Sequence, residues 1–245
     1  MDEDVLITPQ QYDIIANIQQ RILEKLADNH PVTDILNSLC LLVERLLPNA
    51  AASIMTVDTN NGTLSVMCAP SISKIGHQAL AKLQPGVGGG SCGNAAFHNE
   101  PQYVQNTFED ERWAHLRHVA YDFNICACWS VPVINEHQEV IGTFALSSFE
   151  HRAPALFHKK LLDTCSSIIS IVLKGERSEK RLFLLSTALN NASEGVIITD
   201  KNNHILEVNP AFEKIYGLSE SDVIGKNPNF LSSGLHDSSF YQKLW

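Results

Sequence analysis

The feature that most constrains this sequence is a glycine-rich segment from Gly86 to Gly93, in which five of the eight residues are glycine. Glycines at this density allow positive φ angles and a close approach of the backbone to another surface. The small residues from Asn94 to Phe97 are typical of the first turn of a helix, whose free N–H groups would point toward whatever the loop faces. The segment lacks the Gly-Lys-Ser/Thr ending and the Gly-x-Gly-x-x-Gly register of phosphate-binding loops. It is therefore interpreted as a tight connection between two elements of the fold.

The composition and charge of the chain exclude several classes of protein. Its 245 residues are 44% hydrophobic and 18% charged, which is typical of a globular protein of one or two domains. The net charge of −9 argues against a nucleic-acid partner, because no stripe of Lys and Arg is present to contact phosphates. No apolar run is long enough to span a membrane, and the acidic start from Asp2 to Asp4 is unlike a signal peptide. We therefore expect a cytoplasmic protein with no membrane partner and with six reduced cysteines.

Hydrophobic periodicity predicts the order of helices and strands. Apolar residues at helical spacing predict a helix over 9–28 and a second from 32, which Pro48 ends. The turn sequence Asn60 to Gly62 separates two β-rich runs, which predicts a hairpin. The expected elements also include strands at 51–57, 63–68, 102–105, 125–134 and 140–147, helical segments at 77–83 and within 106–116, and a helix at 155–192 that Gly175 interrupts. This order predicts an α+β fold with a central antiparallel sheet and helices on one face.

Three motifs in this order resemble those of bacterial GAF domains. They are Gly-Gly-Ser-Cys-Gly-Asn-Ala-Ala-Phe at 89–97, Cys-Trp-Ser-Val-Pro-Val at 128–133 and Val-Ile-Gly-Thr-Phe-Ala-Leu at 140–146. The resemblance covers residues 12–175 and leaves 1–11 as an N-terminal tail. It implies a six-stranded antiparallel sheet with a ligand pocket on one side. The terminal helices would pack on the other side, often against a second subunit.

The C-terminal part of the sequence resembles a different family. A charged run around Gly175 marks a helical connector at 176–187. Residues 188–245 resemble the first half of a PAS domain, with strands at 195–200 and 205–208 and a first helix after Asn209 and Pro210. The tail from 231 is similar to PAS domains that precede diguanylate cyclase and phosphodiesterase modules. Because two strands alone are marginal, we expect an incomplete PAS domain in a chain that is a fragment or a truncated product.

Some GAF proteins reduce free methionine-(R)-sulfoxide, and Cys92 lies in the loop that resembles theirs. The catalytic cysteine of those enzymes lies in a His-x-x-Cys-Asp segment, where this sequence has His118, Tyr121 and Asp122. Tyrosine cannot supply a thiolate nucleophile, and residues 75–85 contain no resolving cysteine. A reductase that uses Cys92 is therefore kept only as an alternative. The residue sets expected for cyclic-nucleotide binding and for bilin attachment are not found in the sequence.

A metal or haem site is a second alternative. His115 and His118 are three residues apart, so on a helix they would share a face. Cys126 and Cys128 would point to the same face of a strand. Imidazole and thiolate are both good ligands for iron or zinc, which leaves a haem-binding gas sensor open. Core packing of small reduced cysteines and solvation of surface histidines are the preferred interpretation.

The GAF resemblance implies a small-molecule pocket near the glycine loop and the segment that follows it. The candidate pocket residues are Gly90, Ser91, Cys92, Trp113, His115, His118, Tyr121, Asp122, Cys126, Cys128 and Ser130. An indole in such a place is interpreted either as core or as a pocket wall. The residues do not identify the effector, and none of them is expected to be catalytic.

These features predict the sensory region of a bacterial signalling protein. The GAF pocket would bind a small effector or respond to redox state, and the helices at 9–28 and 155–190 would relay the change. The apolar stripes of these helices predict a homodimer. The output module would be a cyclic-di-GMP cyclase or phosphodiesterase or a histidine kinase, although no GGDEF, EAL or kinase motif occurs in the sequence. The chain as given is therefore expected to have no catalytic activity.

Overall fold

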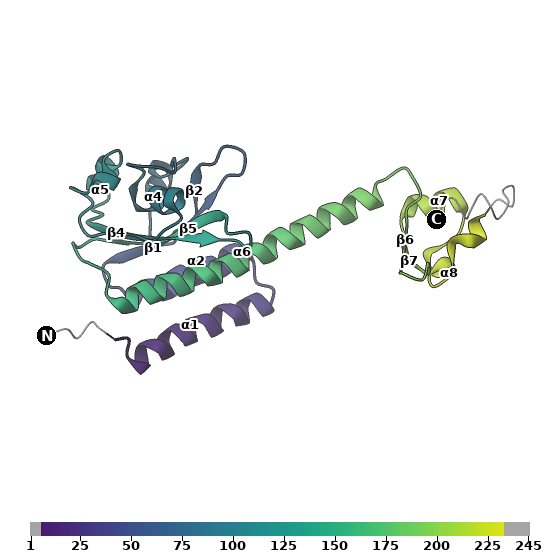
Figure 1. Ribbon diagram of the computed structural model, residues 1–245, viewed down its shortest axis with the longest axis horizontal. Helices are drawn as coiled ribbons and strands as arrows, with labels where there is room; N and C mark the ends of the chain where they lie inside the picture. Colours follow the sequence, from purple (N-terminus) through teal and green to yellow (C-terminus); the bar gives the residue numbers. More distant parts are fainter. Residues whose placement is uncertain (1–5, 233–245) are drawn as a thin grey trace. The chain divides into compact units, whose positions relative to one another are not determined.

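The computed structural model describes residues 6–232, apart from the side chain of residue 179 (Figure 1). The chain forms two compact units that divide between Glu176 and Arg177. The first unit contains the glycine-rich segment, and the second contains the residues that resemble a PAS domain. The expected boundaries at 12–175, 176–187 and 188–245 stay predictions.

The N-terminal helices form as their apolar spacing predicts. Helix α1 (Pro9–Ala27) begins with a capping box, in which Thr8 caps the helix and the Gln11 side chain bonds back to the Thr8 backbone. The helix begins at Pro9, as expected, and ends one residue before the predicted 28. Its buried side chains recur at helical spacing and are Ile15, Ile18 and Ile22. Helix α2 (Val32–Glu44) follows and buries a similar stripe.

Five antiparallel strands form the central sheet in the order β2-β1-β5-β4-β3. Their bounds are β1 (Ala50–Val57), β2 (Leu64–Cys68), β3 (Gln102–Val104), β4 (Ala127–Ile134) and β5 (Val140–Ser148). Gly62 closes the β1–β2 turn at φ 71°, which a residue with a side chain adopts only with strain.

The expectation of six strands is wrong for the described residues. Beside β2, Leu83 makes a single antiparallel bridge to Leu64 through two backbone hydrogen bonds of 2.8 and 2.9 Å. No ladder continues from this bridge, because Pro85 has no N–H and the Gly86 N–H donates to the Gly93 carbonyl instead.

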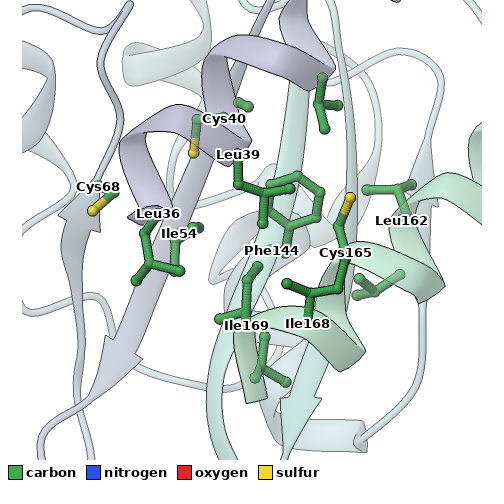
Figure 2. Close-up of a cluster of buried hydrophobic side chains, with 14 of the residues drawn as sticks. Leu36, Leu39, Cys40, Ile54, Cys68, Phe144, Leu162, Cys165, Ile168 and Ile169 are labelled. Carbon is green, nitrogen blue, oxygen red and sulfur yellow. The ribbon is translucent and has the colours of Figure 1, made fainter. Parts of the chain in front are cut away.

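The main hydrophobic core lies between the sheet and the helices α1, α2 and α6 (Leu156–Asn190). Figure 2 shows side chains of α2 and α6 converging on the strands, with Phe144 of β5 between Leu39 and Ile168. Cys40 and Cys165 lie in this core among aliphatic side chains and are fully buried. Full burial of an aliphatic or aromatic side chain contributes about 1.5–3 kcal/mol, so this layer stabilises the first unit.

Helix α6 also hydrogen-bonds to the sheet. Strand β3 pairs with β4 only from Cys128 to Ser130, so in the described part of the chain the rest of that β4 edge has no strand beside it. There the Ser166 hydroxyl donates to the Pro132 carbonyl, and the Ser170 hydroxyl donates to the Ile134 carbonyl, both at 2.6 Å. Serine hydroxyls thereby satisfy acceptors that a sheet edge otherwise leaves open.

The opposite face of the sheet carries shorter helices. They are α3 (Lys74–Ala79), α4 (Gly90–His98), the 3-10 turn η1 (Glu111–Trp113) and α5 (Arg117–Asp122). Three expectations need correction here. Helix α4 begins at Gly90, four residues before the expected start at Asn94, and α3 lies earlier than 77–83. Helix α6 runs through Gly175 without a break, because a single glycine weakens a helix by only about 1 kcal/mol.

The second unit contains a two-stranded antiparallel sheet, β6 (Ile197–Thr199) and β7 (Ile205–Val208), followed by α7 (Pro210–Tyr216), α8 (Glu220–Val223) and the 3-10 turn η2 (Pro228–Leu231). Phe212 fills its small core and is fully buried. Asn209 caps α7, and Pro210 occupies the first helical position, as expected. Of the tail that begins at 231, residues 233–245 lie outside the described part of the chain.

Candidate functional site

A cavity of about 230 Å³ lies between the sheet and helices α3 and α5. It is lined by Ala51, Ser71, Ile72, Ser73, Gly76, Leu80, Val119, Phe123, Ile125, Ser147 and Phe149. The lining contains no charged side chain, so it favours a neutral ligand, since burying a charge without a partner is unfavourable. The volume is below the roughly 300–1,000 Å³ of pockets that hold drug-sized molecules. The cavity therefore suits a small and mainly apolar molecule.

The polar groups of the cavity are three serine hydroxyls. The Ser71 hydroxyl donates to Glu44 Oε2 at 2.6 Å, and the Ser147 hydroxyl donates to Cys128 Sγ at 3.7 Å. The Ser73 hydroxyl accepts the Gly76 N–H at 3.3 Å and caps α3. Because Ser71 and Ser147 give their protons to protein groups, they offer acceptor lone pairs to the cavity. A ligand with an apolar body and one hydrogen-bond donor matches this lining.

The glycine segment does not line this cavity; it fixes α4 against β4. The Ser91 hydroxyl donates to the Cys128 carbonyl at 2.8 Å and accepts the Trp113 indole N–H at 3.0 Å. The Asn94 side chain donates to the Gly90 carbonyl at 2.8 Å. At Gly88, φ is +83° and an added Cβ would lie 2.6 Å from His115 Nδ1, so this position requires glycine. The segment is a tight connection, as its lack of phosphate-loop endings indicated.

Two thiols lie where α4 packs on β4. Cys92 is half-buried in the first turn of α4, and its Sγ accepts a hydrogen bond from the Ser130 hydroxyl at 3.5 Å. Hydrogen bonds from Cys128 and then Ser130 lower the pKa of Cys92 to about 7, although burial acts in the opposite direction. The pKa of Cys128 is raised well above its ordinary value, first because its thiol donates to Cys92 and then because it is buried. The pair thus consists of an acidic thiol beside a protonated one.

The thiols of the main core behave differently. Burial raises the pKa of Cys68 to about 11 and raises those of Cys40 and Cys165 further. These three side chains therefore stay protonated and serve as small apolar core residues.

The eleven predicted pocket residues fall into two groups. One cluster at the α4–β4 contact contains Gly90, Ser91, Cys92, Trp113, Cys128 and Ser130. The other residues lie apart from it and are His115, His118, Tyr121, Asp122 and Cys126. Tyr121 is exposed and stacks on Phe108 with ring centroids 4.5 Å apart. None of the eleven is among the residues that line the cavity.

The predicted metal ligands are not brought together. His115 precedes α5 while His118 lies within it, so the two do not share a helical face, and both are exposed. The Cys126 thiol contacts the Asn124 carbonyl, whereas Cys128 contacts Cys92. Within residues 6–232, no group of three or more His, Cys, Asp or Glu side chains could hold a metal ion. The cavity lining also lacks the His, Cys, Met or Tyr that haem iron requires, so these residues do not fit a haem.

Sequence reasoning missed the residues of the cavity. Ala51, Ser71 and Ser147 come from distant parts of the chain, and they are small residues without distinctive chemistry. One signal was present in the sequence of β5. This strand is buried over most of its length, yet it carries hydroxyl side chains at Thr143 and Ser147. A fully buried strand normally carries larger apolar side chains.

Comparison with known proteins agrees with the fold. A GAF domain model matches residues 29–174, and a PAS fold model matches residues 184–245. The chain is 23% identical over 214 residues to the methyl sulfide methyltransferase-associated sensor of Methanosarcina acetivorans, an alignment that covers 84% of this chain and 21% of the relative. The chain thus spans about a fifth of the length of that relative.

Two solved structures show the same fold at low identity. The GAF domain of a phosphoenolpyruvate-protein phosphotransferase from Coxiella burnetii has a TM-score of 0.58 and 17% identity, over 70% of this chain and 96% of that chain. The reduced form of fRMsr of Staphylococcus aureus has a TM-score of 0.52 and 18% identity, over 65% of this chain and 94% of that chain. With the family match over more than half of the chain, these findings confirm the resemblance. The chain belongs to the GAF domain family, and its GAF domain is followed by a PAS fold.

Proposed function

We propose that this chain is a sensory region that binds a small, neutral and mainly apolar molecule in the cavity between the sheet, α3 and α5. The observation that carries the proposal is the cavity itself, with an uncharged lining and serine acceptors. The match to GAF and PAS families and the similarity to a sensor support a sensory role. Tyr121 stands where the reductase resemblance requires the catalytic cysteine, so turnover of methionine sulfoxide is not part of the proposal.

The sheet separates the cavity from helix α6, which leads to the second unit. Ala51 and Ser147 are paired residues of β1 and β5 that line the cavity, while Ser166 and Ser170 of α6 bond to β4. A ligand shifts a conformational equilibrium only by its difference in affinity for the two states. We propose that occupancy of the cavity changes how the sheet packs on α6.

Helix α6 offers a surface for a second copy of this chain. Ile171, Leu182 and Leu185 are exposed and fall on one heptad seam, in which the spacing alternates between three and four residues. Small residues, Gly175 and Ser178, occupy the seam positions between them. A parallel homodimer through this seam would pass the signal to an output module of the cyclic-di-GMP or kinase class. Within residues 6–232 no helix has the length and apolar character needed to cross a bilayer, and a cytoplasmic location is part of the proposal.

The test compares indole with indene, which has a similar shape but no N–H donor. We expect isothermal titration calorimetry to show saturable binding of both, with tighter binding of indole. Apolar cavities of about 150 Å³ bind benzene, so this one has room for a bicyclic probe. Ser147→Ala removes one of the two serine acceptors and should reduce the preference for indole over indene.

Variants locate the binding. Ala51→Val adds two methyl groups to the cavity and should abolish the binding of both probes, while Ser53→Val, two residues along β1 and outside the lining, should not. Circular dichroism and thermal melting report whether each variant is folded. Absence of saturable binding by the wild-type chain, or equal binding by Ala51→Val, would contradict the proposed function.

A further inference from the structure

The two faces of strands β4 and β5 differ in chemistry. The face toward α6 carries large apolar side chains, among them Trp129, Phe144 and Leu146. The face toward α4 carries small thiol and hydroxyl side chains at buried positions, which are Cys128, Ser130, Thr143 and Ser147. Buried faces usually carry apolar side chains. A polar layer around Cys92 therefore indicates a function that packing alone does not require.

Thr143 is the clearest sign that this layer serves the thiol. The residue is fully buried, and its hydroxyl has no hydrogen-bond partner among residues 6–232. It nevertheless lies close enough to Cys92 to help stabilise the thiolate, after the larger contributions of Cys128 and Ser130. A buried hydroxyl without a hydrogen-bond partner costs free energy. That cost is recovered whenever a neighbouring group ionises and accepts its proton in a hydrogen bond. The thiolate of Cys92 is such a group.

We propose that Cys92 and Cys128 form a thiol–disulfide pair that hydroperoxides oxidise. The pair would give the GAF domain a redox input beside the ligand cavity. This input does not require the cavity to be occupied, so either proposal can fail without the other.

The chemistry takes two balanced steps. The Cys92 thiolate attacks one oxygen of the hydroperoxide, so that an S–O bond forms and the O–O bond breaks. The sulfur gives two electrons to the peroxide, and hydroxide leaves, or alkoxide in the case of an organic hydroperoxide. The Cys128 sulfur then attacks the sulfenic acid of Cys92, the S–S bond forms, and the hydroxyl group leaves as water with the Cys128 proton. A dithiol reductant reverses the change by exchange.

The charge state of Cys92 suits the first step, because the thiolate is the nucleophile. With a pKa of about 7, roughly half of Cys92 is ionised at neutral pH, whereas a thiol of ordinary pKa 9.0 is ionised to about 1%. Nucleophilicity falls with pKa, which offsets part of this advantage. We expect Cys92 to react about 5-fold faster than an exposed thiol of ordinary pKa, and faster still than the buried Cys40 and Cys165.

The experiment treats the reduced 245-residue chain with one molar equivalent of hydrogen peroxide at neutral pH. Remaining thiols are alkylated, and the digested chain is read by peptide mass spectrometry. The expected product is a linked pair of peptides containing Cys92 and Cys128, lighter by two hydrogen atoms, before Cys165 reacts. Cys128→Ser should form no link but should retain a sulfenic acid on Cys92 that dimedone traps.

Matched variants separate a redox pair from simple exposure. Cys126→Ser removes a neighbouring thiol and should leave the Cys92–Cys128 link unchanged. Thr143→Val should slow oxidation of Cys92 severalfold while near-ultraviolet circular dichroism shows a retained fold. A link from Cys128 to another cysteine that forms equally fast in Cys92→Ser, a link from Cys92 to Cys126, or reaction of Cys92 no faster than Cys165 would overturn the proposal.

Discussion

The Asn209 side chain makes four hydrogen bonds that connect separate segments of the second unit. Its Oδ1 accepts the N–H groups of Val196 and Phe212 at 2.8 and 3.0 Å. Its Nδ2 donates to the carbonyls of Leu189 and Glu194 at 3.0 and 2.9 Å. One side chain thus links the end of α6, the segment before β6 and the start of α7. Only 5% of Asn209 is exposed, so water does not easily replace these partners.

We predict that Asn209→Ala lowers the local stability of the second unit by about 3 kcal/mol. Loss of the helix cap costs about 1 kcal/mol. The carbonyls of Leu189 and Glu194 then lack their donor, at the low end of about 1–3 kcal/mol each because they are only partly buried. Asn209→Asp keeps the acceptor for the cap but places a carboxylate oxygen against two carbonyls, so we expect a loss of at least about 2 kcal/mol.

Amide hydrogen exchange measured by NMR tests this prediction at the two donor groups. The N–H groups of Val196 and Phe212 should exchange roughly 100-fold faster in Asn209→Ala, which corresponds to about 3 kcal/mol. Asn202→Ala is the control, because Asn202 is an exposed asparagine of the β6–β7 turn whose backbone bond to Asp200 survives the change. Exchange in Asn209→Ala within threefold of the wild type would refute the reasoning.

Three further predictions concern the first unit and α6. The pKa of Cys92 is lowered to about 7, so its ionisation stabilises the folded chain as pH rises from 7 to 9, and this contribution is lost as pH falls through 7. Urea unfolding under reductant should show that the free energy of unfolding rises by an amount on the order of 1–2 kcal/mol over this range. Cys92→Ser should remove the rise. Gly142→Ala would place a Cβ 2.3 Å from the Met55 carbonyl oxygen and should lower the free energy of unfolding by about 3 kcal/mol in the same assay. A decrease of less than about 0.5 kcal/mol would contradict this close approach. Leu182→Glu should make the proposed dimer monomeric in sedimentation experiments, whereas Phe183→Glu, off the seam, should not; a dimer unchanged by Leu182→Glu would exclude the seam.

Local signals were sufficient to predict most elements of the fold. The isoleucines of α1 recur at helical spacing, and the Asn61-Gly62 turn fixes a hairpin, because both depend on residues close in sequence. The start of α4 could not be predicted in this way. Gly90 has φ +65° and low helix propensity, and it begins the helix because Ser91 is anchored to β4 by a tertiary hydrogen bond.

The candidate sites depended on contacts between distant residues. The Cys92–Cys128 neighbourhood was within the predicted set, because the loop motif and the β4 motif were both recognised, but which of the six cysteines meet was set by how α4 packs on the sheet. The cavity was outside the set, since its serines and alanine resemble ordinary small residues in the sequence. His115 and His118 were selected because imidazole is a common ligand, but both are exposed, and His115 lies before α5.

The most direct test of the sensory account is an NMR measurement of where a probe binds. With isotope-labelled chain and saturating indole, intermolecular nuclear Overhauser effects should connect the indole protons to the methyl groups of Ala51 and Val119, which line the cavity. The same spectra should show no such contact to Ile171, which lies in a separate groove beside α6. Contacts to Ala51 and Val119 in the wild-type chain, with loss of the contacts to Val119 in Ala51→Val, would establish the cavity as a binding site. Contacts confined to Ile171, or none at all, would contradict the central claim.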